Sequence, residues 1–105
     1  MAHFERISID IAFGMMTDGT AQVVDVRDEQ SYASSRIPGA THLTNTNLQD
    51  FIQEADPDLP LIVYCYHGNS SQSAAAFLNE KGFDNTYSMD GGFEQWRVRF
   101  PTENE

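Results

Sequence analysis

The chain has 105 residues and a single cysteine, and its 16 acidic against 6 basic side chains give a formal charge of −10. Nucleic acids and anionic membranes bind clusters of Lys and Arg, so this charge argues against both as partners. The length and the 40% of hydrophobic residues predict one domain, over residues 1–105, with a single core. One cysteine cannot form an internal disulfide or a cysteine-rich metal cluster, so we expect a cytoplasmic protein with a free thiol.

Strand and helix patterns alternate along the chain. In chain order we predict a strand at 4–7, a helix around 11–16, strands at 22–26 and 40–43, a helix at 48–55, a strand at 61–64, a helix at 71–81, a strand at 86–89 and a helix at 93–100. The runs at 22–26 and 61–64 are continuously apolar or β-branched, as in parallel strands that are covered on both faces. We therefore predict an α/β fold with a largely parallel central sheet and helices on both faces.

Two helices also carry signals for their ends. Thr46 and Gln49 have the spacing of a capping box at the start of the helix at 48–55. Gly82 follows the helix at 71–81, in the position where a glycine commonly ends a helix. In sheets of this kind the functional crevice lies at the carboxyl ends of the strands, so the loops that follow the strands are the candidate sites.

The loop after the strand at 61–64 has the properties of an anion site. It runs from Cys65 to the helix that starts at Ser71, so the N–H groups of residues 66–71 lie at a helix N-terminus, where they can cradle an anion. Gly68 and Asn69 tolerate the positive φ that a tight loop needs. The same donors would lower the pKa of the Cys65 thiol and favour the nucleophilic thiolate. The alternative is a cysteine that only ends a core strand.

The segment around this loop contains no formal charge. Between Leu59 and Asn79 there is no Asp, Glu, Lys or Arg, although 21% of the whole chain is charged. A buried strand and a packed helix explain part of this gap. The polar loop between them has no such reason to lack carboxylates, whereas a site for small anions does.

Four motifs, in order along the chain, resemble those of the rhodanese family, and in particular its single-domain thiosulfate sulfurtransferases. They are the strand motif at 23–28, the Pro-Gly-Ala segment at 37–43, the loop at 65–71 and the Gly-Gly-to-Trp segment at 88–96. The resemblance covers nearly the whole chain. It implies one rhodanese-like domain that needs neither a metal nor an organic cofactor.

The resemblance also implies a double-displacement mechanism. The Cys65 thiolate would attack the outer sulfur of thiosulfate, release sulfite and become a persulfide. A second nucleophile would then take this sulfur: cyanide, or a thiol such as that of a thioredoxin-like dithiol protein. The substrate and the persulfide would be held by the loop residues Tyr66, His67, Gly68, Asn69, Ser70 and Ser71.

The side chains of the loop have individual expectations. His67 should shape the loop or line the pocket rather than act as a general base, because sulfur transfer between soft anions requires no proton abstraction from a substrate. Ser70 and Ser71 either donate their hydroxyls to the bound sulfur or cap the following helix.

Three charged residues elsewhere also have expected roles. Asp25 and Arg27 flank Val26 on one strand, so their side chains share a face, and we expect a buried structural ion pair rather than substrate contact. Arg36 is expected to be an ordinary surface arginine, with a place near the pocket entrance as the alternative.

Three other functions are compatible with parts of the pattern. Cysteine-dependent phosphatases and arsenate reductases use Cys-x5-Arg, but position 71 is serine and no basic residue occurs between Cys65 and Lys81. A non-catalytic interaction module is disfavoured because the cysteine is present. A persulfide relay that passes sulfur to a partner protein uses the same chemistry and stays open. Many rhodanese loops carry basic residues, and this loop has none.

Overall fold

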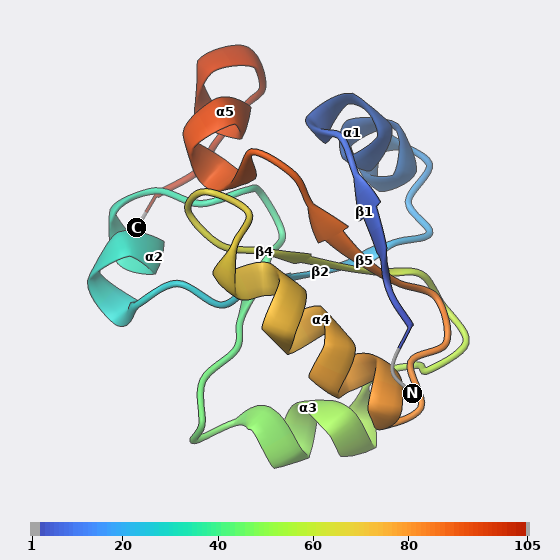
Figure 1. Ribbon diagram of the computed structural model, residues 1–105. Helices are drawn as coiled ribbons and strands as arrows, with labels where there is room; N and C mark the ends of the chain where they lie inside the picture. Colours follow the sequence, from blue (N-terminus) through green and yellow to red (C-terminus); the bar gives the residue numbers. More distant parts are fainter. Residues whose placement is uncertain (1–2, 105) are drawn as a thin grey trace.

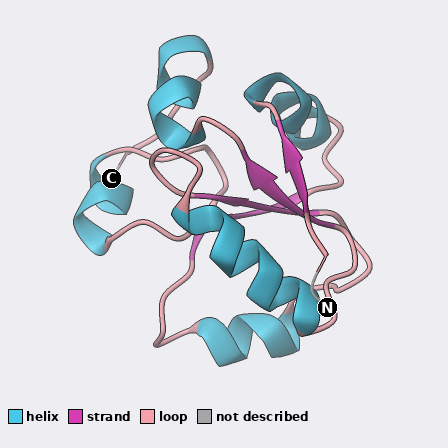
Figure 2. Cartoon of the chain, in the orientation of Figure 1, coloured by secondary structure: helices cyan, strands magenta, loops and turns pink. Residues whose placement is uncertain are grey.

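Five parallel strands form the central sheet of the protein. The structure is a computed structural model that describes residues 3–104. The strand order is β1-β5-β4-β2-β3, and every neighbouring pair is parallel (Figures 1 and 2). The strands are β1 (Glu5–Ile7), β2 (Gln22–Asp25), β3 (Thr41–His42), β4 (Leu61–Tyr64) and β5 (Thr86–Met89).

The register of the central strands places two loops side by side. Asp25 at the end of β2 pairs with Tyr64 at the end of β4, and the Val26 N–H donates to the Tyr64 carbonyl at 3.0 Å. Because both strands run in the same direction, Arg27 and Cys65 leave the sheet at the same edge. This edge holds the candidate site.

Helices cover both faces of the sheet, as predicted. α1 (Ile9–Thr17) and α5 (Gly92–Arg99) lie on one face, and α3 (Leu48–Glu54) and α4 (Ser70–Glu80) lie on the other (Figure 1). A fifth helix, α2 (Glu29–Ser34), follows β2 near the loop that precedes α4. None of the helices among residues 3–104 has the length and apolar character needed to cross a bilayer.

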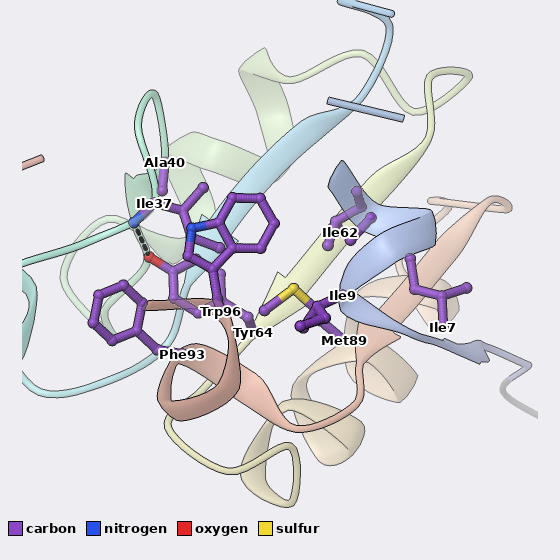
Figure 3. Packing of buried hydrophobic residues seen from close by; sticks show 10 residues of the cluster. Ile7, Ile9, Ile37, Ala40, Ile62, Tyr64, Met89, Phe93 and Trp96 are labelled. Carbon is purple, nitrogen blue, oxygen red and sulfur yellow. Dashed lines mark hydrogen bonds between the residues drawn. The ribbon is translucent and has the colours of Figure 1, made fainter. Parts of the chain in front are cut away.

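The continuous apolar run of β4 contributes residues to both hydrophobic cores. All four of its residues are buried, and successive side chains point to opposite faces. Ile62 and Tyr64 join the core under α1 and α5, where Trp96 is the largest member (Figure 3). Leu61 and Val63 join the core under α3 and α4. The fold class predicted from the sequence is confirmed.

Two sequence signals at helix ends have different outcomes. After α4 the Phe83 N–H donates to the Leu78 carbonyl and the Gly82 N–H to the Asn79 carbonyl, with Gly82 at φ 111°, so the predicted glycine terminus is confirmed as a Schellman motif. The capping box predicted for Thr46 and Gln49 is wrong. The N-cap of α3 is Asn47, whose side chain accepts the Thr44 N–H and donates to the His42 carbonyl, tying the helix start to the strand before it.

Candidate active site

The thiol of Cys65 lies at the carboxyl end of β4, inside the loop that leads into α4. Its Sγ accepts the N–H of Gly68 at 3.1 Å and the N–H of Ser71 at 3.2 Å, and it is 3.4 Å from the Ser71 hydroxyl oxygen. The residue is 5% exposed. Ser71 is held in turn by Ser88 of β5, because the two hydroxyl oxygens lie 2.8 Å apart. The sulfur therefore sits among hydrogen-bond donors in a largely dry site.

The donors around the sulfur change its acidity. Burial by itself would raise the pKa of Cys65, because it disfavours the charged thiolate. The hydroxyl and N–H of Ser71, together with the N–H groups of Gly68 and His67, outweigh burial, so the pKa of the thiol lies below its ordinary value. The thiolate is therefore populated at a lower pH than in an unperturbed cysteine.

Replacing Ser71 by alanine tests this assignment. The Ser71→Ala variant removes the hydroxyl that does most to lower the pKa of Cys65, so this pKa should rise and the midpoint of the alkylation rate against pH should move to higher pH. Iodoacetamide kinetics across the pH range measure that midpoint. The matched control is Ser70→Ala, one residue earlier in the same helix but exposed. Equal midpoints for both variants would contradict a role for the Ser71 hydroxyl.

The remaining loop residues take positions that the sequence only partly predicted. Gly68 has φ 95°, whereas Asn69 has φ −94°, so of these two residues only the glycine adopts the positive φ that both tolerate. Helix α4 begins at Ser70 rather than Ser71, with Asn69 as an N-cap that makes no side-chain hydrogen bond, so neither serine caps the helix. The side chains of Tyr66 and His67 are exposed and stack on each other at 4.9 Å between ring centroids.

His67 faces the surface of the molecule. Its Nδ1 is 3.4 Å from a carboxylate oxygen of Glu94, and its side chain is 61% exposed. The backbone of His67 lies in the loop around the sulfur, while its ring is engaged with Tyr66 and Glu94. The His67 ring therefore connects the loop to the first turn of α5.

The first turn of α5 holds the loop in place from the outside. The Phe93 N–H donates to the Cys65 carbonyl at 2.9 Å, and the Glu94 N–H donates to the Tyr66 carbonyl at 3.0 Å. A Cβ built on Gly92, which has φ 58°, would lie 2.4 Å from the Tyr66 carbonyl oxygen. Only a glycine allows the helix and the loop to approach this closely.

Replacing Gly92 by alanine should therefore loosen the site. The added methyl group has to push back the carbonyls of Tyr66 and Cys65, which we expect to cost about 1–3 kcal/mol beyond the penalty for positive φ. The matched control is Gly19→Ala, because Gly19 has φ 76° but nothing within 4 Å of its Cβ position. Urea denaturation of both variants measures the difference. Equal losses of stability would mean that the close approach is unimportant.

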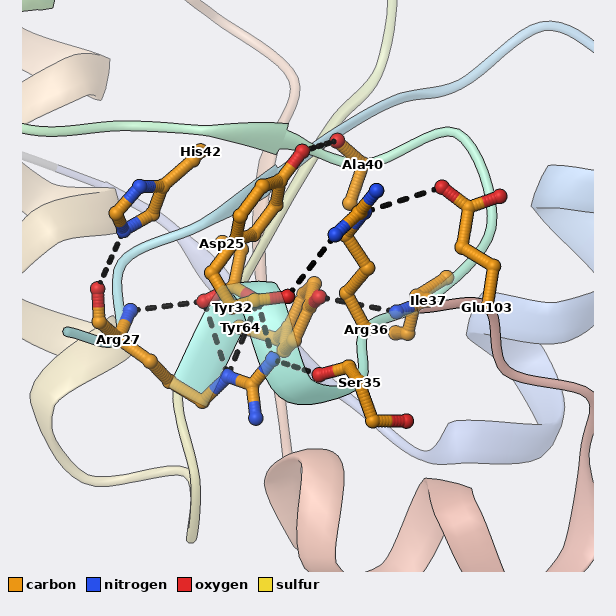
Figure 4. Close-up of polar contacts among 10 residues, drawn as sticks. All are labelled: Asp25, Arg27, Tyr32, Ser35, Arg36, Ile37, Ala40, His42, Tyr64 and Glu103. Carbon is orange, nitrogen blue, oxygen red and sulfur yellow. Dashed lines mark hydrogen bonds and ion pairs between the residues drawn. The ribbon is translucent and has the colours of Figure 1, made fainter. Parts of the chain in front are cut away.

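Asp25 and Arg27 form the expected buried ion pair at the same edge (Figure 4). Arg27 donates to both carboxylate oxygens of Asp25, with the shortest contact at 2.7 Å, and to the Ser35 carbonyl. Burial would lower the pKa of Arg27, but the hydrogen bonds and charge of Asp25 outweigh burial and raise it. The guanidinium also lies over the Phe93 ring, 4.2 Å from its centroid, which links β2 to α5.

Arg36 is not the ordinary surface arginine that we predicted. Its side chain is only 12% exposed and stacks over the Tyr32 ring. It donates to the Tyr32 carbonyl at 3.0 Å and to a carboxylate oxygen of Glu103 at 3.1 Å (Figure 4). Arg36 therefore fastens the C-terminal segment to α2. Its sequence neighbours carry no periodic pattern that could have predicted this contact.

A polar pocket of about 490 Å³ opens beside the loop. Its walls come mainly from three elements: Gln30, Ser31 and Ser34 of α2, Phe93 and Arg97 of α5, and Tyr66 of the loop. Sequence reasoning missed α2, because the helix buries no residue and has no apolar period. It also missed Arg97, although the spacing of four residues from Phe93 places both on one helix face.

The chain is similar in sequence to proteins of one known family. A sequence profile for the Rhodanese-like domain matches residues 9–99. The chain is 56% identical over 103 residues to the thiosulfate sulfurtransferase GlpE of Pseudomonas entomophila, covering 98% of this chain and 94% of that protein. A protein with the same name from Ectopseudomonas mendocina is 57% identical over 103 residues, with the same coverage. The chain belongs to the rhodanese family.

Solved structures agree with this assignment at the level of the fold. The rhodanese-like domain from Anabaena superposes with a TM-score of 0.85 at 20% identity, covering 98% of this chain and 81% of that one. A rhodanese-like domain protein from Staphylococcus aureus gives a TM-score of 0.83 at 20% identity, covering 97% and 99%. The parallel sheet and its covering helices are thus the rhodanese architecture.

In this rhodanese the four sequence motifs meet at one edge of the sheet. The first supplies Asp25 and Arg27, and the third supplies the loop around Cys65. The second contributes the Ile37 N–H, which donates to the Tyr64 hydroxyl at 3.1 Å. The fourth contributes Gly92 and the N–H groups that hold the loop. The motifs are therefore parts of one structural unit around the thiol.

Proposed function

We propose that this rhodanese is a thiosulfate sulfurtransferase with Cys65 as its nucleophile. The observation that carries the proposal is the Cys65 sulfur itself, which accepts two backbone N–H groups and lies next to the Ser71 hydroxyl. The two relatives above, which match along almost their whole length, carry the same activity in their names. The lowered pKa of the thiol supports attack by the thiolate, because it populates the thiolate at lower pH.

The first half of the reaction forms a persulfide. The Cys65 thiolate attacks the outer sulfur of thiosulfate, a new S–S bond forms, and the bond to the sulfonate sulfur breaks so that sulfite leaves with its electron pair. The persulfide carries one negative charge, as the thiolate did. The N–H groups of Gly68 and Ser71 are therefore placed to stabilise charge before, during and after the transfer.

The second half returns the thiolate. Cyanide attacks the outer sulfur of the persulfide and leaves as thiocyanate, or a thiolate attacks and leaves as a new persulfide. In both cases the Cys65 thiolate is the leaving group, and its lowered pKa makes it a better one. A thioredoxin-like dithiol protein is a suitable acceptor, because its second thiol can release the sulfur. The chemistry needs a reduced thiol, which favours the cytoplasm.

Two alternatives would use the same cysteine, one with a different partner and one with a different substrate. A relay would pass the same persulfide to a partner protein, with thiosulfate as an incidental donor. A phosphatase or arsenate reductase would need an arginine to clamp the oxyanion, and the residue in that position is Ser71, whose hydroxyl is directed to Cys65 and Ser88. A serine in this position therefore supports thiosulfate, which is smaller and softer than the substrates of those enzymes.

Rapid mixing with thiosulfate tests the proposal. Without an acceptor, one equivalent of sulfite should be released per protein, and added cyanide should then start steady thiocyanate formation. Double-reciprocal plots at several cyanide concentrations should be parallel, as double displacement requires. Release of no sulfite, together with turnover of p-nitrophenyl phosphate, would overturn the proposal in favour of a phosphatase.

A further inference from the structure

We propose that the pocket between α2 and α5 binds the carboxylate of a small thiol acceptor, and that Arg97 selects for this group. The inference rests on the proposed sulfurtransferase function and adds to it the class of the acceptor. It places the recognition of the acceptor in the pocket, outside the loop that holds the sulfur.

The charge of the pocket favours an anion. Its charged lining residues are Arg27 and Arg97, and no Asp or Glu of residues 3–104 lines it. This is unusual in a chain whose formal charge is −10. Local positive charge on a strongly acidic protein indicates a place where a negative group is bound.

Of the two arginines, Arg97 is available to a ligand. Arg27 already donates to Asp25 and to the Ser35 carbonyl. Arg97 is exposed, and within the described part of the chain it makes neither a hydrogen bond nor an ion pair. A guanidinium with its full set of N–H donors can bind a carboxylate through two parallel hydrogen bonds.

The size and position of the pocket suit a ligand longer than thiosulfate. Its volume of about 490 Å³ corresponds to about sixteen water molecules. Tyr66, the residue after Cys65, lines the pocket, whereas Cys65 itself does not. A molecule that contacts both Arg97 and the sulfur must therefore reach beyond the pocket, and an extended thiol suits this better than the compact thiosulfate ion.

The other lining groups fit a short peptide-like thiol. Gln30, Ser31, Ser34 and Thr102 offer an amide and hydroxyls, which donate to and accept from amide groups.

In the transfer step the acceptor thiolate attacks the outer sulfur of the Cys65 persulfide. One S–S bond forms, the S–S bond to Cys65 breaks, and the Cys65 thiolate leaves, so that charge and atoms balance.

A pair of acceptors that differ only in the carboxylate tests the inference. N-acetyl-Cys-Gly with a free C-terminal carboxylate is compared with its C-terminal amide, using the full protein and saturating thiosulfate. The measured quantity is the ratio of kcat/KM for the acid to kcat/KM for the amide. This ratio is taken for the wild type, Arg97→Gln, Arg97→Lys and Arg99→Gln.

Arg99→Gln is the matched control, because it makes the same change in net charge on the same helix. Arg99 pairs with Asp10 at 2.8 Å and lies outside the lining of this pocket. Differences in thiol reactivity between the two acceptors cancel when the ratios are compared between variants.

We expect the ratio to fall about fivefold to tenfold in Arg97→Gln, to be unchanged in Arg99→Gln and to be partly kept in Arg97→Lys. The same fall, or no fall, in both glutamine variants would overturn the inference. Release of sulfite from thiosulfate is measured separately, and the Arg99→Gln control should leave it unchanged. If no sulfite is released even by the wild type, it is the proposed function that fails.

Discussion

Cys65→Ser is expected to lower sulfur transfer from thiosulfate to cyanide by at least about a thousandfold. The serine hydroxyl stays protonated near neutral pH, and a persulfide cannot form on oxygen. The fold should persist, because a serine oxygen can accept the same N–H groups of Gly68 and Ser71 that the sulfur accepts. Thiocyanate formation measures the loss, and circular dichroism with thermal unfolding measures the fold.

Ser70→Ala serves as the control for a change in the same loop. Ser70 is exposed and begins α4, so its replacement should leave most of the activity. Transfer by the Cys65→Ser variant at more than a few per cent of the wild-type rate would contradict the assignment of the nucleophile.

Asp25→Asn is expected to lower the free energy of unfolding by about 3–5 kcal/mol. Asp25 is fully buried and the Arg27 side chain is 5% exposed, so the variant leaves an arginine charge in the interior without its counter-ion. The asparagine amide group would also face the N–H donors of Arg27. Urea denaturation of the two proteins measures the change.

The exposed pair of Arg6 and Asp90 provides the comparison. Their side chains are 60% and 42% exposed, and their contact of 2.8 Å is nearly as short as the 2.7 Å contact of the buried pair. Asp90→Asn should therefore cost at most about 1 kcal/mol, because water screens the charges and solvates the arginine that remains. Similar losses in the two variants would contradict the view that burial makes the Asp25 carboxylate important.

Since Arg27 also contacts the Phe93 ring, activity should fall together with stability in Asp25→Asn.

The parts of the site that the sequence predicted are those encoded locally. The apolar run of β4, the cysteine at its end and the glycine in the following loop are neighbours in the chain, and the structure places the cysteine after the strand with the Gly68 N–H donating to its sulfur. The ion pair of Asp25 and Arg27 was also predictable, because alternate residues of a strand share a face.

The parts that the sequence did not predict depend on contacts between distant segments. Helix α2 has no buried residue, so it lacks the apolar period by which helices are recognised. The cap of α3 is made by Asn47, whose hydrogen bonds reach back to His42 and Thr44. Arg97 becomes part of the pocket only because α5 packs beside α2 and the loop, and nothing in its immediate neighbours indicates this.

Intact-mass spectrometry after incubation with thiosulfate tests the central claim most directly, which is that Cys65 carries the transferred sulfur. We expect the protein to gain the mass of one sulfur atom, with the modification located at Cys65 by peptide mapping, and to lose it on addition of cyanide. The Cys65→Ser protein should gain nothing under the same conditions. A wild-type protein that forms thiocyanate steadily but never carries sulfur on Cys65 would contradict the mechanism.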